Sequence, residues 1–79
     1  MVSKSFGKAV RVARVRRDLT QAELAQAARI RQGTVGRIER GEREPTLSVI
    51  VRIAESLGMK GWELIRAMED ERPTTSPPA

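Results

Sequence analysis

The stretch of residues 20–39, TQAELAQAARIRQGTVGRIE, constrains the fold most, because it encodes two short helices separated by a tight turn. Thr20 is a suitable N-cap residue, and Glu23, three residues later, completes a capping box. Residues 21–28 are strong helix formers whose apolar side chains recur on one face. A second helical pattern follows over residues 32–40. The chain is therefore expected to contain a helix-turn-helix unit.

The second helix of this unit has an outer face that suits a particular kind of partner. Its end is predicted at Gly41, because glycine commonly follows the last residue of a helix. Its outward residues offer hydrogen-bonding groups and one fork-shaped cation without a carboxylate, and they are Gln32, Gly33, Thr34 and Arg37. Such a set matches the edges of bases in the major groove of DNA.

Three further helices are predicted around this unit, which makes the domain all-α. The first covers residues 5–17 and the last residues 62–70. Between them, the most regular amphipathic stripe of the chain consists of Leu47, Ile50, Ile53, Ala54 and Leu57. Residues 1–4 are expected to be a flexible lead, and the proline-rich segment 71–79 a disordered tail. The sequence therefore predicts a single domain that covers residues 5–70.

Composition argues against several classes of function. The chain has no cysteine and no histidine, so disulfides, thiolate metal sites and a completed zinc site are excluded, and no metal or other cofactor is expected. Nucleophilic or hydrolytic catalysis has few credible residues, and an enzyme is not expected. No apolar run approaches the roughly 20 residues of a membrane span, and no signal-peptide core is evident, so we expect a cytoplasmic, nucleoid-associated protein.

The net charge of +5 is unevenly distributed along the chain. Residues 1–43 contain eleven Lys and Arg against four Asp and Glu, whereas residues 44–79 contain four against six. A polyanionic partner is therefore expected to bind the N-terminal half. Charge excess alone is equally compatible with a solvated surface, and the helix pair described above favours the polyanion.

These landmarks resemble the XRE (Cro/cI-type) helix-turn-helix family. The resemblance rests on TQAELAQ at 20–26, IERG at 38–41, Pro45-Thr46 and SLGM at 56–59, and it extends from about Phe6 to Ile65. It implies a five-helix, lambda-repressor-like DNA-binding domain. Repressor or Cro proteins and the controller proteins of restriction–modification operons are similar in size.

The resemblance also implies roles for individual residues. Gln32, Thr34 and Arg37 match the positions that read bases, and Gly33 could only permit close approach. Family positions that contact the DNA backbone are matched by Gln21, Arg31, Arg40 and Arg43. Arg14 and Glu39 match a buried ion pair that ties the first helix to the third. Apart from this structural ion pair, these side chains form the expected interface with double-stranded DNA.

The sequence departs from the family pattern at the turn and in the helix that follows it. Arg29 stands where the family usually has a glycine in a left-handed conformation, at a steric cost. Arg31 replaces the Ser or Thr that normally caps the next helix, so a weaker cap is expected. Gly33 and Gly36 each lower helix propensity by about 1 kcal/mol relative to alanine.

One such module buries little surface on DNA, so we expect a homodimer on a pseudo-palindromic operator. The last helix and its preceding loop have more large apolar side chains than packing of so short a helix on the core requires. The expected dimer surface consists of Met59, Trp62, Ile65 and Met68. Two alternatives stay open. The same fold serves as the antitoxin of toxin–antitoxin pairs, and it could also act as a protein-binding adaptor that does not bind DNA.

Overall fold

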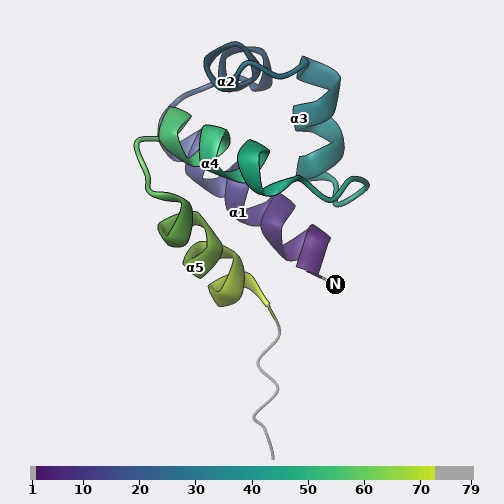
Figure 1. Cartoon of the computed structure of the whole chain (residues 1–79), viewed down its shortest axis with the longest axis vertical. Coiled ribbons are helices and arrows are strands. Elements are labelled where there is room, and N and C mark those ends of the chain that lie inside the picture. The colour runs from purple at the N-terminus through teal and green to yellow at the C-terminus, as the bar shows by residue number, and fades with distance from the viewer. Residues whose placement is uncertain (1, 73–79) are drawn as a thin grey trace, which may run out of the picture.

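Five helices follow one another in the computed structural model, which describes residues 2–72, and no strand occurs among those residues (Figure 1). The helices are α1 (Val2–Arg16), α2 (Gln21–Ala28), α3 (Gln32–Glu39), α4 (Leu47–Ser56) and α5 (Gly61–Glu71). The expected all-α fold is confirmed. None of these helices has both the length and the apolar character needed to cross a membrane.

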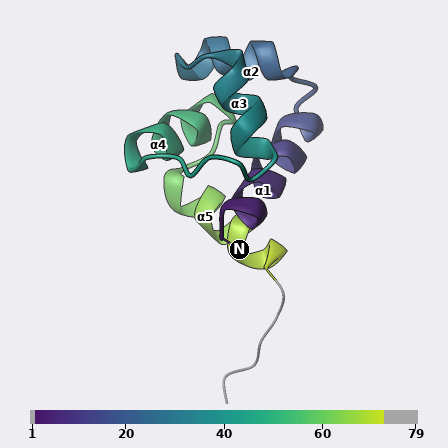
Figure 2. The ribbon, with the colours of Figure 1, turned by 90° about the vertical axis from the view of Figure 1, so that its right-hand side faces the viewer.

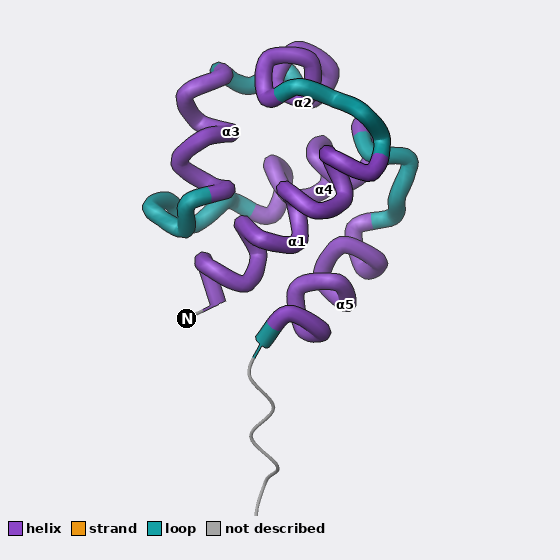
Figure 3. The backbone as a smooth tube through the Cα atoms, turned by 180° about the vertical axis from the view of Figure 1, so that it is seen from behind, coloured by secondary structure: helices purple, strands orange, loops and turns teal. Residues whose placement is uncertain are grey.

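The helices are arranged so that α3 lies at one edge of the molecule and α5 at another. Figure 2 looks onto α3, with α2 above it, α4 on one side and α1 on the other. Seen from behind, α1 and α5 run side by side, and these two helices share the most extensive helix–helix contact (Figure 3). The edge that carries α3 is therefore separate from the face that carries α5.

The N-terminal segment differs from the expected flexible lead, because α1 already begins at Val2. Val2 and Ser3 line a small hollow together with Pro45 from the loop before α4. In addition, the backbone of Lys4 packs against Gly41, so closely that a Cβ on Gly41 would lie 2.9 Å from the Lys4 Cα. These long-range contacts hold the first turn of α1 in place, and sequence periodicity contains no signal of them.

Local capping signals place the starts of α2 and α4 where they were expected. The Thr20 hydroxyl accepts a hydrogen bond from the Glu23 amide at 3.0 Å, and the Glu23 carboxylate accepts from the Thr20 amide at 2.9 Å. The bond that the Thr20 amide donates to the carboxylate is the main cause that lowers the pKa of Glu23. Thr46 caps α4 in the same way, by accepting from the Val49 amide. Gly41 and Gly58 have φ values of 74° and 69°, as glycines after a helix end often do.

The core lies between α1 and the other four helices and is entirely apolar at its centre. Phe6 and Val10 of α1 meet Leu24, Val35, Ile38, Ile53, Leu57 and Leu64, which are almost fully buried. The predicted apolar stripe of α4 is wrong at Leu47, which lies outside this core because 77% of it is exposed. It is the first residue of α4, and the buried stripe of that helix is centred farther along, at Ile53 and Leu57.

The C-terminal boundary also differs by a residue from the expected tail at 71–79. Glu71 is the last residue of α5, and its carboxylate lies 3.1 Å from the Lys8 ammonium of α1. This exposed ion pair joins the end of α5 to α1. The rest of the expected tail, from residue 73 onward, lies outside the described residues.

Candidate nucleic-acid interface

The packing of α3 determines which of its residues can meet a partner. Val35 and Ile38 are buried, and they anchor the helix on the core. Gly7 of α1 lies directly beneath it, where an added Cβ would collide with the carbonyl oxygens of Ile38 and Glu39. Only glycine therefore allows α1 to approach α3 this closely, a requirement that cannot be read from the sequence pattern.

A three-residue network fixes α3 relative to the two preceding helices. The Arg14 guanidinium of α1 donates to both carboxylate oxygens of Glu39, at 2.6 Å and 3.0 Å. The Gln21 amide of α2 donates to the same carboxylate at 3.1 Å. The Glu39 side chain is only 4% exposed, and its hydrogen bonds with Arg14 raise the pKa of that guanidinium. Helices α1, α2 and α3 thus meet at one buried carboxylate.

The outer face of α3 presents the side chains that were expected to read bases. Gly33 and Arg37 are exposed and lie about 40° apart around the helix axis, at the centre of this face. Gln32 and Thr34 lie on opposite sides of that centre, about 120° and 80° from it around the helix axis. Gln32 is exposed at the start of the helix, and Thr34 is half-buried on the side toward α4. The one carboxylate of α3, that of Glu39, points inward.

A groove between α3 and α4 gathers most of the cations near this face. We call it the arginine groove, and it is lined by Ile30, Arg31, Gly33, Thr34, Arg37, Arg43, Val49 and Arg52. Two of the predicted backbone-contacting residues, Arg31 and Arg43, therefore lie beside Arg37. Arg52 was not identified from the sequence, where it reads as an ordinary polar position of an amphipathic helix.

Arg40, another predicted backbone contact, is oriented differently. It does not line the arginine groove. Its guanidinium donates to the Glu42 carboxylate at 2.8 Å and 3.4 Å, and both side chains are exposed. This hydrogen-bonded pair raises the pKa of Arg40 and lowers that of Glu42. A carboxylate thus lies at the end of α3, although the outer face of the helix itself has none.

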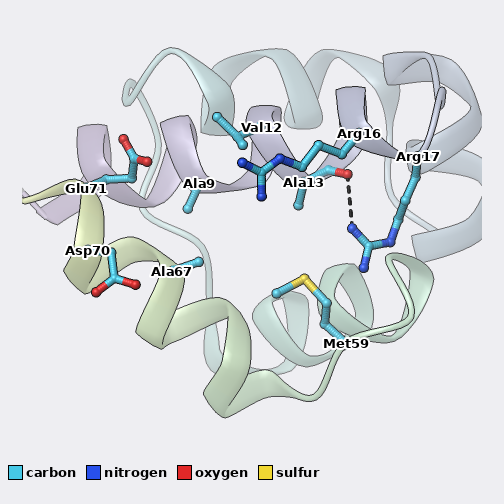
Figure 4. A pocket seen from close by; sticks show the side chains of 9 residues that line it. All are labelled: Ala9, Val12, Ala13, Arg16, Arg17, Met59, Ala67, Asp70 and Glu71. Atoms are coloured by element: carbon cyan, nitrogen blue, oxygen red, sulfur yellow. Dashed lines mark hydrogen bonds between the residues drawn. The ribbon is translucent and has the colours of Figure 1, made fainter.

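A second hollow, between α1 and α5, has a different character (Figure 4). Small side chains of both helices line it, with Met59 and Arg17 toward one end and Asp70 and Glu71 toward the other. The Arg17 guanidinium donates to the Ala13 carbonyl oxygen at 3.2 Å. Because cations and carboxylates share its rim, this hollow has no net preference for a polyanion.

The predicted dimer surface is not a single patch. Met68 is 6% exposed and belongs to the core, because α5 turns it inward next to Leu64. Met59 lies in the hollow between α1 and α5, whereas Ile65 lines the hollow near Pro45 on the other side of α5. Only Trp62, at 61% exposure, is a large free apolar side chain of this set.

The turn of the helix-turn-helix unit has the conformation implied by the family. Arg29 follows α2 with φ 59° and ψ 44°, which is left-handed, and it adopts this conformation although it is not a glycine. Arg31 precedes α3 and forms no side-chain capping bond. A second left-handed residue that was not expected is Asp18, at φ 54° in the turn after α1.

Substituting Gly33 by alanine is expected to raise the free energy of unfolding by about 1 kcal/mol, because alanine has the higher helix propensity. A Cβ at Gly33 would have no neighbour within 4 Å, so no clash offsets this gain. Gly58→Ala is the matched control, since its surroundings are equally open but its φ of +69° makes alanine costly. Urea denaturation should therefore show shifts of opposite sign, and a destabilised Gly33→Ala protein would contradict the expectation.

This geometry defines a helix-turn-helix domain with a cationic outer helix, and comparisons with known proteins place it further. A helix-turn-helix family model matches residues 10–63, more than half of the chain. The protein therefore belongs to the XRE-type helix-turn-helix family. As a member of this family, it is a DNA-binding transcriptional regulator. Among curated protein sequences no match was found.

Three solved structures illustrate the similarity. The restriction-modification controller protein C.AhdI from Aeromonas hydrophila is 32% identical, with a TM-score of 0.77 over 78% of this chain and 94% of its own. The hypothetical transcription factor NHTF from Neisseria is 26% identical, with a TM-score of 0.78 over 82% and 75%. The clp gene regulator ClgR from Corynebacterium glutamicum shares the fold, with 24% identity and a TM-score of 0.85 over 89% and 74%.

Proposed function

We propose that the protein binds operator DNA as a two-fold dimer, with α3 of each subunit in the major groove. The observation that carries this proposal is the outer face of α3. Arg37 is exposed there, and the space around Gly33 is open. Arg37 is the principal base-reading residue, because a guanidinium can donate two hydrogen bonds to one guanine. Thr34 and Gln32 read bases on either side of it.

The backbone of the DNA is held at the two ends of the helix pair. Gln21 uses one amide hydrogen for Glu39 and retains a second, which is free to bind a phosphate oxygen. Its position at the first turn of α2 adds the positive end of the helix dipole. Arg31 and Arg43 contact phosphates beside α3. The predicted role of Arg40 at the backbone requires its ion pair with Glu42 to open.

The dimer is proposed to form through the exposed apolar side chains of α4 and α5, which do not line the arginine groove. Trp62 is 61% exposed, and Leu47 and Val51 of α4 are 77% and 41% exposed. Val51 lies next to the start of α5, with its Cγ2 3.7 Å from the Cβ position of Gly61. Ile65 of α5 is half-buried. Contact between two copies here would leave α3 accessible in both (Figure 1).

The operator can be identified by selecting bound fragments from a pool of random DNA. The proposal expects the selected sequences to contain two related half-sites whose centres lie about 34 Å, or one helical turn, apart. Enrichment of a single unrepeated site would contradict the dimer, and no enrichment over the starting pool would contradict sequence-specific binding.

Replacing Gln21 with alanine is expected to weaken DNA binding by about 1 kcal/mol, because a hydrogen bond to the phosphate is lost. The loss should be the same on the operator and on random duplexes, since a phosphate carries no sequence information. Fluorescence anisotropy with both duplexes measures it. Gln26→Ala, at an exposed glutamine of the same helix, is the matched control. A loss confined to the operator would instead assign base reading to Gln21.

A further inference from the structure

We infer that the arginine groove holds one sugar–phosphate strand of the bound DNA, with Arg52 of α4 as a backbone-contacting residue. The inference rests on the proposed function, because it places a strand beside the major groove that α3 enters. It extends the DNA interface to α4. It also names a contact that replaces the one expected from Arg40.

Arg52 is placed so that it can support the turn and bind a phosphate at the same time. Its side chain is half-buried between α3 and α4, and one Nη1 hydrogen is donated to the Arg29 carbonyl oxygen at 3.4 Å. A guanidinium has five donor hydrogens, so four remain available. Val49, on the same helix, and Ile30 provide apolar surface in this groove. One long, exposed hydrogen bond thus links the guanidinium to the turn, while most of its donors are free.

No carboxylate lines the arginine groove itself, and Glu42, which interacts with Arg37 and pairs with Arg40, lies outside its lining. Four of its eight lining residues are arginines, and none is acidic. The hollow between α1 and α5 differs, since Arg16 and Arg17 share its rim with Asp70 and Glu71. Cations that gather without carboxylates are the electrostatic mark of a polyanion site. Arg31, Arg37, Arg43 and Arg52 therefore attract a run of negative charges.

A continuous strand fits this groove better than a compact free anion does. The groove opens directly onto the outer face of α3, since Gly33, Thr34 and Arg37 line it. No buried side-chain nitrogen or oxygen among the described residues lacks a hydrogen-bond partner, so no enclosed polar pocket awaits a single phosphate. When α3 lies in the major groove of DNA, the phosphates along one edge of that DNA groove pass the side of α3 that carries Thr34.

Arg40 lacks both properties that favour Arg52. Its guanidinium is bound to Glu42 at 2.8 Å, and it lies outside the arginine groove. Opening this pair on DNA would leave a carboxylate near the phosphates, which opposes binding. The structure thus favours Arg52 over Arg40 as a contact to the DNA backbone, whereas the sequence pointed to Arg40.

The salt dependence of DNA affinity tests the inference. The slope of log affinity against log salt concentration is negative, and each lost phosphate contact should reduce its magnitude by about 0.9. Arg52→Gln is expected to show this decrease, with equal fold-losses on the selected operator and on random DNA. Arg66→Gln is the charge-matched control, because Arg66 is an exposed residue of α5. It should leave the slope unchanged, as should the charge-neutral double variant Arg40→Gln, Glu42→Gln.

Several outcomes would overturn the inference. An unchanged slope for Arg52→Gln would show that Arg52 contacts no phosphate. Equal decreases for Arg52→Gln and Arg66→Gln would show that Arg52 acts only through overall charge. A lowered slope for the Arg40, Glu42 double variant would assign the contact to Arg40. Failure of the wild-type chain to bind any duplex would instead contradict the proposed function itself.

A measurement on the wild-type protein covers the case in which Arg52→Gln does not fold. The Nε–Hε NMR signal of Arg52 should shift when the operator duplex is added, whereas that of Arg66 should stay in place. Titration with inorganic phosphate separates the two sources of phosphate. Saturable shifts of the Arg52 signal at millimolar phosphate would indicate a free-anion site and contradict the strand assignment.

Discussion

Arg37→Ala is expected to weaken binding to the selected operator by about 1–3 kcal/mol and to relax the choice of base at one position in each half-site. The guanidinium is exposed at the centre of the outer face of α3, and no ion pair engages it among the described residues. It can therefore donate two hydrogen bonds to one base edge. Binding curves on the operator and on its single-base variants measure both effects.

Arg37→Lys separates base reading from charge. Lysine keeps the positive charge but lacks the planar fork, so affinity for random DNA should be retained while discrimination at that base decreases. Operator affinity that is unchanged in Arg37→Ala would remove Arg37 from the interface. A loss of equal size on random DNA would reassign it to the DNA backbone.

Glu39→Ala is expected to lower the free energy of unfolding by about 3–5 kcal/mol, because it removes one partner of a buried ion pair. The Arg14 side chain is 13% exposed, and Glu39 accepts two of its three hydrogen bonds, while the Leu19 carbonyl oxygen accepts the third. The substitution also deprives the Gln21 amide of its acceptor. Urea denaturation followed by circular dichroism gives the value directly.

Two further variants show whether the cost arises from the ion pair. Glu55→Ala removes an exposed glutamate of α4 and should change stability by no more than about 0.5 kcal/mol. In a double-mutant cycle with Arg14→Met, the combined variant should lose clearly less than the sum of the two single losses. Additive losses, or a cost for Glu39→Ala as small as that of Glu55→Ala, would mean that the pair does not anchor α3.

The features that could be predicted from the sequence are those with a local physical cause. The capping box of Thr20 and Glu23 joins residues three apart, and Gly41 and Gly58 follow the helices that they end. The inward positions of Val35 and Ile38 follow from helical periodicity within one element. The all-α order of five helices depends only on such signals, and it is confirmed.

The features that could not be predicted depend on contacts between distant segments. Gly7 reads as a weak point of a helix, yet the crossing of α1 beneath α3 requires it. Met68 fits an amphipathic surface on paper, but α5 is rotated so that this side chain enters the core. Leu47 extends an apolar stripe in sequence, and it is exposed because the stripe turns away from the core at the start of α4.

The proposed DNA interface divides in the same way. The outward side of α3 follows from periodicity, so Gln32, Thr34 and Arg37 could be chosen without a structure. The arginine groove could not be, because it forms only when α4 packs beside α3 and brings Arg52 next to the turn. The pairing of Arg40 with Glu42 depends on side-chain rotamers in an exposed loop, which sequence does not determine.

Methylation interference on the selected operator tests the entry of α3 into the major groove most directly. Dimethyl sulfate modifies guanine at N7 in the major groove and adenine at N3 in the minor groove. Methylation of one guanine N7 in each half-site should abolish binding of the wild-type chain, and Arg37→Ala should lose that sensitivity. Interference confined to adenine N3, or insensitivity to methylation at every guanine, would contradict the account.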